Sequence, residues 1–177
     1  MEITNLTCTF SVNCAVSFNT LKNKIYNCEF KRNFCVWRIR KPRATALLFE
    51  SGSVTMSGIT SYSQAKCAAR IFTRKLQRAG YEQAALKSFK VQNVVTYMKV
   101  QHKLKLEKLS SVTDHRVMYE PELSNAALML GEGSKRLRFF QSGSIISTGY
   151  KSVEEAKADE PFICLLAKSI LWPTANI

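Results

Sequence analysis

A ten-residue stretch occurs twice in this chain, and the repeat limits the folds that the chain can adopt. Residues 49–58 read FESGSVTMSG, and residues 140–149, which lie 91 positions later, read FQSGSIISTG. In each copy an apolar strand ends at Phe, Ser-Gly makes a tight turn, a short strand follows, and a Gly precedes the start of a helix. The sequence therefore predicts two units, each containing a β-hairpin that leads into a helix.

Hydrophobic periodicity predicts the same order of elements, β-α-β-β-β-β-α, in both halves of the chain. In the first half we expect strands at 3–12, 26–32, 34–40, 44–50 and 53–58, a short helix at 18–25 and a long helix at 61–80. In the second half we expect strands at 89–95, 117–123, 126–130 and 135–141 before the hairpin strand, with a short Leu/Lys segment at 103–109 in place of the first helix. The last helix should run from Ser152 to about Leu171 and kink or restart at Pro161. No linker of Gly/Ser/Pro composition separates the repeats, placed at 1–88 and 89–177, so we expect one continuous sheet.

The charge of the chain is concentrated in its first half. Residues 1–90 hold 15 Lys/Arg against 4 Asp/Glu, whereas residues 91–177 hold 11 against 9, for a net charge of +13. Such a surplus usually meets a polyanion, and nucleic acid is favoured over a membrane because no amphipathic Trp/Leu-rich helix accompanies it. The alternative is a basic surface that serves only solubility. We expect no transmembrane helix and no signal peptide, because the chain has neither a long apolar run nor a charged-then-apolar leader.

The six cysteines show no C-x-x-C pairing and no nearby group of histidines. This spacing predicts neither a zinc site nor another metal site, and no pattern indicates a cofactor. We expect these cysteines to be reduced, buried thiols of an intracellular protein.

Further motifs follow one another along the chain: RIRKPR at 38–43, ALLFESG at 46–52, AAR at 68–70, QN at 92–93 and YEPEL at 119–123. In this order and spacing they resemble the core domain of the TATA-box-binding protein (TBP) family, over about residues 3–171. The stretches at 8–14 and 41–43 are more similar to the divergent TBP-related (TBP-like factor) branch. The resemblance implies an α+β fold, a pseudo-twofold saddle of two repeats. Its curved ten-stranded antiparallel sheet would bind the DNA minor groove with the concave face and carry helices on the convex face.

The resemblance, together with strand alternation, also identifies candidate DNA-binding residues. Asn5 and Asn93 match the paired asparagines that the family places over the central base step. An amide can donate to and accept from base edges, although a strand Asn commonly just bonds to a neighbouring backbone group. The surrounding floor of the groove-binding face would consist of Thr7, Thr55, Ser57, Val95, Ile146 and Thr148.

Phe49 and Phe140 match two of the four phenylalanines with which the family kinks DNA, although a Phe at a strand end is ordinarily a core residue. Phe34 is the candidate for a third wedge, and the fourth position falls at Ser124.

Other departures concern charge. Ser53 and Ser144 stand where the family has lysines that reach phosphate, Arg138 replaces an apolar contact, and Glu132-Gly133 replaces Lys-Pro. We therefore predict weak or non-TATA binding that depends mainly on the basic first repeat. Its candidate contacts include Arg38, Arg40 and Arg43.

Three surfaces match protein contacts of the family. A basic stripe on the first long helix would bind acidic regulatory proteins, unless it is only a solvated face; it consists of Lys66, Arg70, Arg74 and Arg78. Glu120, Glu122 and Leu123 match the stirrup that binds the B initiation factor of RNA polymerase II. The edge strand at about 26–34 corresponds to the site where the A initiation factor adds a strand. These matches imply a nuclear platform for initiation by RNA polymerase II.

Two other functions remain open at this point. One is a sequence-specific TATA-type binder that bends promoter DNA through the minor groove. The other is a TBP-like appendage of a DNA-repair or ribonuclease enzyme. An enzyme would need clustered acids or a Lys/Asp pair, whereas the acids here are scattered and His102 and His115 are the only histidines. We therefore expect no catalytic residues and no enzymatic activity.

Overall fold

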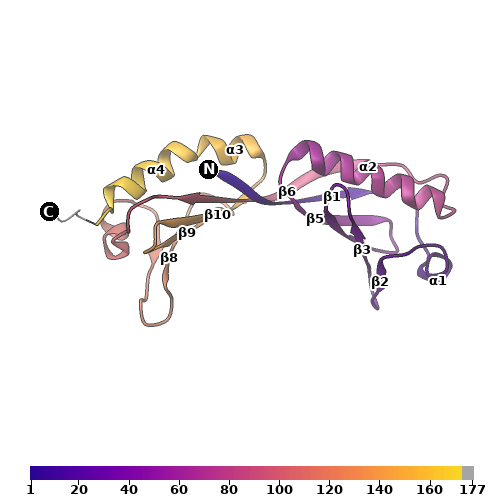
Figure 1. The fold of residues 1–177 in the computed structure, drawn as a ribbon, viewed down its shortest axis with the longest axis horizontal. Coiled ribbons are helices and arrows are strands. Elements are labelled where there is room, and N and C mark those ends of the chain that lie inside the picture. The colour runs from indigo at the N-terminus through magenta and orange to yellow at the C-terminus, as the bar shows by residue number, and fades with distance from the viewer. Residues whose placement is uncertain (173–177) are drawn as a thin grey trace. The chain divides into compact units, whose positions relative to one another are not determined.

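The computed structural model describes residues 1–172 and has the predicted α+β fold with a ten-stranded antiparallel sheet. The order of the strands is β2-β3-β4-β5-β1-β6-β10-β9-β8-β7. The chain divides into two compact units (Figure 1). One is Asn5–Gln92, here called the first-repeat unit, and the other is Met1–Thr4 with the chain from Asn93 onward, the second-repeat unit. Strands β1 and β6 therefore contribute residues to both units.

The first-repeat unit consists of one sheet layer and one long helix. Its elements are β1 (Glu2–Ser11), α1 (Phe18–Leu21), β2 (Cys28–Phe30), β3 (Cys35–Ile39), β4 (Ala44–Leu48), β5 (Ser53–Ile59) and α2 (Tyr62–Arg78). Alternate strand residues are buried under α2, where the ring centroid of Phe72 lies 5.8 Å from that of Phe10 and 5.0 Å from that of Trp37. The opposite face of these strands is half-exposed, and we call it the open face of the unit.

Helix α2 has the sequence signals that its length requires. The Ser61 side chain caps the first turn by accepting a hydrogen bond from the Gln64 amide at 3.3 Å. Gly80, just beyond the helix, has a φ of +101°, the left-handed conformation that commonly ends helices. The predicted helix at 61–80 is confirmed to within about two residues.

The second-repeat unit repeats this layering. Its elements are β6 (Lys87–Lys99), the 3₁₀ helix η1 (Leu106–Ser111), β7 (Val117–Met118), β8 (Ala126–Leu130), β9 (Arg136–Phe140), β10 (Ser144–Tyr150), α3 (Val153–Ala158) and α4 (Glu160–Ser169). Its core joins Met129, Phe139 and Ile145 of the sheet to Ile163 and Leu166 of α4. The predicted restart at Pro161 is confirmed, since Pro stands in the first turn of α4.

Several predicted elements are shorter than the sequence suggested. Helix α1 is a single turn instead of 18–25, and β2 spans three residues instead of 26–32. The segment expected at 103–109 forms η1 slightly later, at 106–111. Strand β7 ends at Met118 instead of continuing to Leu123, because the chain turns there and the Ser124 amide donates to the Glu120 carbonyl at 2.9 Å. No helix within residues 1–172 is long and apolar enough to cross a membrane.

Candidate nucleic-acid interface

The open face of the first-repeat unit carries a row of small polar and apolar side chains. Thr9 of β1 pairs with Thr55 of β5, which pairs with Leu47 of β4, and Leu47 pairs with Val36 of β3. All four are half-buried, while their sequence neighbours on these strands are buried under α2. Thr7 and Ser57 are half-buried in the same alternation. Asn5, Thr7, Thr55 and Ser57 therefore lie on the open face, and their contact with DNA stays a prediction.

The open face of the second-repeat unit has a corresponding row with different chemistry. Leu128 of β8 pairs with Arg138 of β9, Arg138 with Ile146 of β10, and Ile146 with Tyr97 of β6. Arg138 and Ile146 stand 91 residues after Leu47 and Thr55. An exposed arginine thus replaces a half-buried leucine at the centre of the row.

The remaining predicted residues of this face are placed as expected. Thr148 is half-exposed two residues beyond Ile146, and Val95 is half-exposed on β6. Val95 lies between buried Val94 and Thr96, and Thr148 follows buried Ser147, so the strand alternation puts both side chains on the open face.

The two asparagines have equivalent environments in the two units. The Asn5 Oδ1 atom accepts a hydrogen bond from the Gly58 amide at 2.9 Å, and Asn93 Oδ1 accepts one from the Gly149 amide at 2.8 Å. Both glycines have a positive φ, of +85° and +96°, beside an irregularity in strand register. Because a backbone N–H can only donate, the amide oxygen must face it, which fixes the orientation of each side chain.

This orientation sharpens the role expected for these residues. The amide of each asparagine uses its acceptor inside the protein, and within residues 1–172 its Nδ2 group has no protein acceptor. What each side chain offers a ligand is therefore a fixed donor. The A·T minor groove presents only acceptors, adenine N3 and thymine O2, whereas G·C adds a donor that would oppose the amide.

The candidate wedge residues differ between the units. The Phe34 and Phe49 rings lie side by side with centroids 6.0 Å apart, so the hairpin between β2 and β3 brings its Phe to the end of β4. In the second-repeat unit, Phe140 lines a pocket of about 430 Å³ with Ser124 and Leu128. The Ser124 hydroxyl donates to the Ala126 carbonyl at 3.1 Å and does not fill this pocket. One unit thus has two rings in contact, whereas in the other Phe140 and Tyr119 line a hollow.

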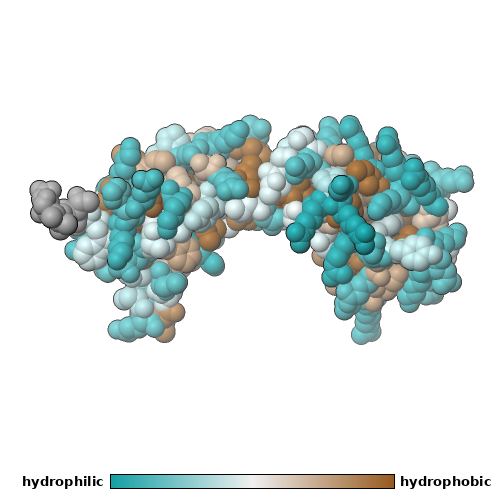
Figure 2. All heavy atoms as spheres, viewed as in Figure 1, coloured by the Kyte–Doolittle hydropathy of each residue, from teal (hydrophilic) through white to brown (hydrophobic). Residues whose placement is uncertain are grey.

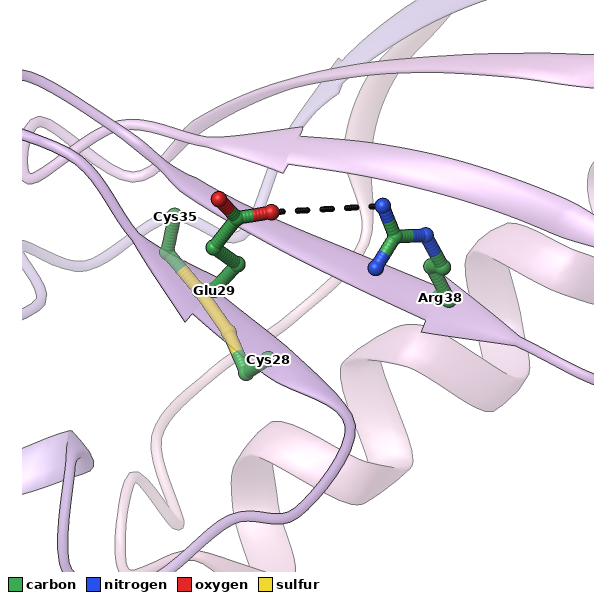
Figure 3. The surroundings of a disulfide bond; sticks show 4 residues. All are labelled: Cys28, Glu29, Cys35 and Arg38. Carbon is green, nitrogen blue, oxygen red and sulfur yellow. Dashed lines mark ion pairs between the residues drawn. A yellow bond between two sulfur atoms is a disulfide. The ribbon is translucent and has the colours of Figure 1, made fainter.

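A disulfide between Cys28 and Cys35 ties β2 to β3, so the prediction of six reduced thiols is wrong for these two (Figure 3). Cys35 pairs with Phe30 and Cys28 with Trp37, which places the two cysteines diagonally across the strand pair with Cα atoms 6.5 Å apart. This distance is within the range that a disulfide spans. The prediction rested on the absence of C-x-x-C spacing, whereas a hairpin brings together cysteines that are seven positions apart.

The arginines at the far end of this strand pair lie around one hollow. Arg38, Arg40 and Arg43 line a pocket of about 480 Å³ at the turn from β3 to β4, together with Asn27 and Thr45. The nearest acid is Glu29, 3.9 Å from Arg38, and both are exposed (Figure 3). Such a pair contributes little in water, so the cluster keeps its positive potential.

Lys99 lies at the second hairpin turn and was not among the residues predicted from the sequence. It pairs with Ser144 across β6 and β10, and its Nζ donates to the Ser142 carbonyl at 2.6 Å and approaches the Ser144 hydroxyl at 3.3 Å. The second hairpin therefore carries an ammonium group although its turn residue is Ser. In the first hairpin the residue that pairs with Ser53 is Ser11. Lys99 reaches this turn only because β6 pairs with β10, and this pairing cannot be read from the sequence.

The predicted protein-contact residues are exposed. Lys66, Arg70, Arg74 and Arg78 all lie on the solvent side of α2, along which hydrophilic atoms project (Figure 2). Glu120, Glu122 and Leu123 lie in the turn after β7, and the Leu123 side chain is 81% exposed.

A partly buried ion-pair cluster is specific to the second-repeat unit. Lys135 Nζ lies 2.9 Å from Asp159 and 3.5 Å from Glu155, and 5.5 Å from the centre of the Tyr150 ring. Its hydrogen bond to Asp159 raises the pKa of Lys135, and burial raises the pKa of Tyr150 to about 12. This cluster joins the start of β9 to α3, and so supports the strand that carries Arg138.

Comparisons with known proteins agree with this geometry. The sequence model of the family described as "Transcription factor TFIID (or TATA-binding protein, TBP)" matches residues 1–79 and 88–166. Among solved structures, the chain is similar to Methanococcus jannaschii TBP, with a TM-score of 0.79 over 96% of this chain and 98% of that chain. The two sequences are 21% identical, so this likeness shows a shared fold. The family match over both repeats confirms the predicted resemblance.

Proposed function

The chain belongs to the transcription factor TFIID (or TATA-binding protein, TBP) family of DNA-binding transcription factors, and we propose that it is a TBP-related platform for RNA polymerase II initiation with weak or non-TATA minor-groove binding. The observation that supports DNA binding best is the matched pair of asparagines. Two amide donors held by equivalent glycine amides, one in each repeat, suit the acceptor pattern of A·T pairs.

Weak binding follows from the second repeat. Kinking requires unstacking, which costs a few kcal/mol per base step in minor-groove proteins that include TBP itself. The ring pair of Phe34 and Phe49 has no counterpart at Phe140 within residues 1–172, where a pocket separates Phe140 from Tyr119. Arg138 introduces a charge at the centre of an otherwise apolar row. The second repeat can therefore offset less of the deformation cost than the first.

Electrostatic contacts then supply most of the affinity. Each Lys or Arg that neutralises a phosphate releases counterions, and the gain is independent of base sequence. The hollow around Arg38, Arg40 and Arg43 and the positive charge of residues 1–90 favour contacts from the first repeat, and Lys99 adds a single contact at the second hairpin. DNA would bind with little preference for base order beyond the A·T preference that the two asparagines supply.

The protein contacts of this platform remain those predicted from the sequence. The turn carrying Glu120, Glu122 and Leu123 would bind the general transcription factor B. The edge of β2 would accept a strand from factor A, and the basic stripe of α2 would bind acidic regulatory proteins. With these roles the protein would act in the nucleus. Its two functional repeats would be residues 1–88 and 89–177. Residues 173–177 lie outside the described part of the chain. Recovery of neither factor from nuclear extract by the purified chain would contradict the platform role.

A TATA-type binder that bends DNA is the second candidate. It is favoured by the retention of Phe49, Phe140 and both asparagines in equivalent places. Fluorescence resonance energy transfer between the ends of a duplex separates the two functions. The platform predicts little shortening of the end-to-end distance at saturating protein, whereas strong bending of a TATA duplex alone would establish the second function and overturn the first.

A further inference from the structure

The outer side of α4 and the residues that follow it expose large apolar side chains. Leu165 is 67% exposed and Phe162 is 40% exposed, and Trp172, which follows the helix, is 42% exposed. Phe162 and Leu165 are three residues apart and therefore neighbours on the helix surface. Apolar atoms come to the surface along α4 among hydrophilic ones (Figure 2). We call Phe162, Leu165, Lys168 and Trp172 the α4 surface.

Comparison of the repeats shows that this face has changed its chemistry. With the 91-residue spacing, buried Phe72 and Leu76 of α2 correspond to buried Ile163 and Ala167 of α4, so the inner sides of the two helices agree. On the outer side, Arg70, Arg74 and Arg78 correspond to Pro161, Leu165 and Ser169. Three arginines that keep α2 hydrated are thus replaced by uncharged residues. A surface of this kind usually marks a contact with another molecule.

Three lysines flank the α4 surface. Lys157 and Lys168 are exposed and have no ion pair within residues 1–172. The Lys105 ammonium lies 5.3 Å from the centre of the Trp172 ring, at the other end of the surface. The acids of α3 and α4 that face the unit are paired, Asp159 and Glu155 with Lys135 and Glu160 with the amino group of Met1. The unit also has exposed acids, Glu107, Asp114, Glu132 and Glu154, so the positive charge belongs to these three lysines and not to the whole unit.

The α4 surface also ends at a small cavity. A pocket of about 210 Å³ opens beside Phe162, and its lining is mixed: His115, Met129 and Leu137 stand beside the charged Glu132, Lys135 and Asp159. The His115 and Phe162 rings meet edge to face, with centroids 5.8 Å apart. Such a pocket can hold one side chain of a partner as an anchor, in the way that buried anchors dominate protein interfaces.

We propose that the α4 surface binds an amphipathic, acidic helix of a partner protein. Leucine-like side chains at helical spacing would pack on Phe162, Leu165 and Trp172, and a polar side chain of the same helix could enter the mixed pocket beside Phe162. Carboxylates on both sides of that apolar stripe would meet Lys157, Lys168 and Lys105. The site is distinct from the basic stripe of α2, which offers charge without apolar side chains. It also does not depend on whether the sheet binds DNA.

The test uses the full chain and a fluorescein-labelled synthetic helix with Leu at positions i, i+3 and i+7 flanked by Glu. A sister peptide carries Lys in place of Glu. We expect fluorescence anisotropy to show that the Glu peptide binds at least tenfold more tightly than the Lys peptide. Leu165→Glu should weaken the Glu peptide about tenfold, because a central apolar contact becomes a repulsive charge.

The matched control is Gln83→Glu, which adds one negative charge, as Leu165→Glu does, at an exposed position that belongs to none of the surfaces named above. It should leave binding within about twofold of wild type, since it changes the net charge without changing the apolar stripe. Lys168→Glu, an exchange at an exposed position, should shift preference toward the Lys peptide. An effect of Gln83→Glu equal to that of Leu165→Glu, equal binding of the two peptides, or no binding would each overturn the proposal.

Discussion

Replacing Asn5 by Asp separates the two roles that the structure gives this side chain. Aspartate keeps an oxygen acceptor for the Gly58 amide, 2.9 Å away in the native protein, but it has no amide donor. Alanine removes both. A comparison of Asn5→Asp with Asn5→Ala therefore tests whether the hydrogen bond inside the protein or the free donor matters for DNA binding.

The magnitudes follow from the geometry. Asn5→Ala loses one neutral hydrogen bond, worth about 1 kcal/mol of unfolding free energy, and Gly58 is exposed, so water can satisfy its amide. Asn5→Asp should retain that stability. A good contact between a side chain and a base edge is worth about 1–3 kcal/mol, which corresponds to about 5- to 150-fold in affinity. The Asn5→Asp variant should lose this contact with the base edge, and its carboxylate should also be repelled by the phosphates.

The assay has two parts. Thermal melting should rank Asn5→Asp with wild type and Asn5→Ala below it. Anisotropy with A·T-rich and G·C-rich duplexes should show that both variants lose affinity for the A·T-rich duplex and lose most of the preference between the two. Asn93→Asp, in the equivalent site, serves as the repeat-matched control and should behave alike. Wild-type affinity in Asn5→Asp would refute the assignment of its amide as a donor to DNA.

Three further predictions concern other parts of the chain. Cys35→Ser should lower the unfolding free energy under oxidising conditions by up to about 2.4 kcal/mol, the chain-entropy value for a seven-residue separation; denaturant melts that coincide with and without reductant would contradict the disulfide. Lys135→Met should destabilise the protein by about 1–2 kcal/mol at neutral pH, because Asp159 loses a charged hydrogen bond. Since the pKa of this lysine is raised on folding, its contribution is complete below about pH 10.5, the ordinary lysine value, and is lost as pH rises through the folded-state pKa. A difference from wild type that persists well above that pH would exclude the ion pair as its cause. Arg40→Ala with Arg43→Ala should weaken all duplexes alike and reduce the slope of log affinity against log salt by about 2, and an unchanged slope would remove these arginines from the phosphate contacts.

The repeat and the alternation of its strands were sufficient to predict the order of elements and the facing of the interface residues. Period-two burial in β1, β4 and β5 depends on local sequence, so the pattern of residues alone could assign Asn5, Thr55 and their neighbours to one face of the sheet. Helix α2 carries its own cap and stop signals at Ser61 and Gly80.

The features that the sequence analysis missed depend on which strands pair. The disulfide between Cys28 and Cys35 requires the diagonal of a hairpin, and Lys99 reaches the second turn only because β6 lies beside β10. The orientation of the asparagine amides depends on positive-φ glycines 53 and 56 residues away. Local periodicity contains none of this information. The lengths of the edge strands β2 and β7 were overestimated for a related reason. An edge strand ends where its pairing with the neighbouring strand ends, and local sequence does not show that point.

The ratio of affinities for a TATA duplex and a scrambled duplex of equal composition tests the central claim most directly. When both affinities are measured by competition across a salt series, we expect their ratio to be far below the roughly thousandfold that separates specific from non-specific binding in typical DNA-binding proteins. It also predicts that both affinities fall steeply and in parallel as salt rises, because phosphate contacts supply most of the binding. A large preference for TATA that persists at high salt would contradict the account.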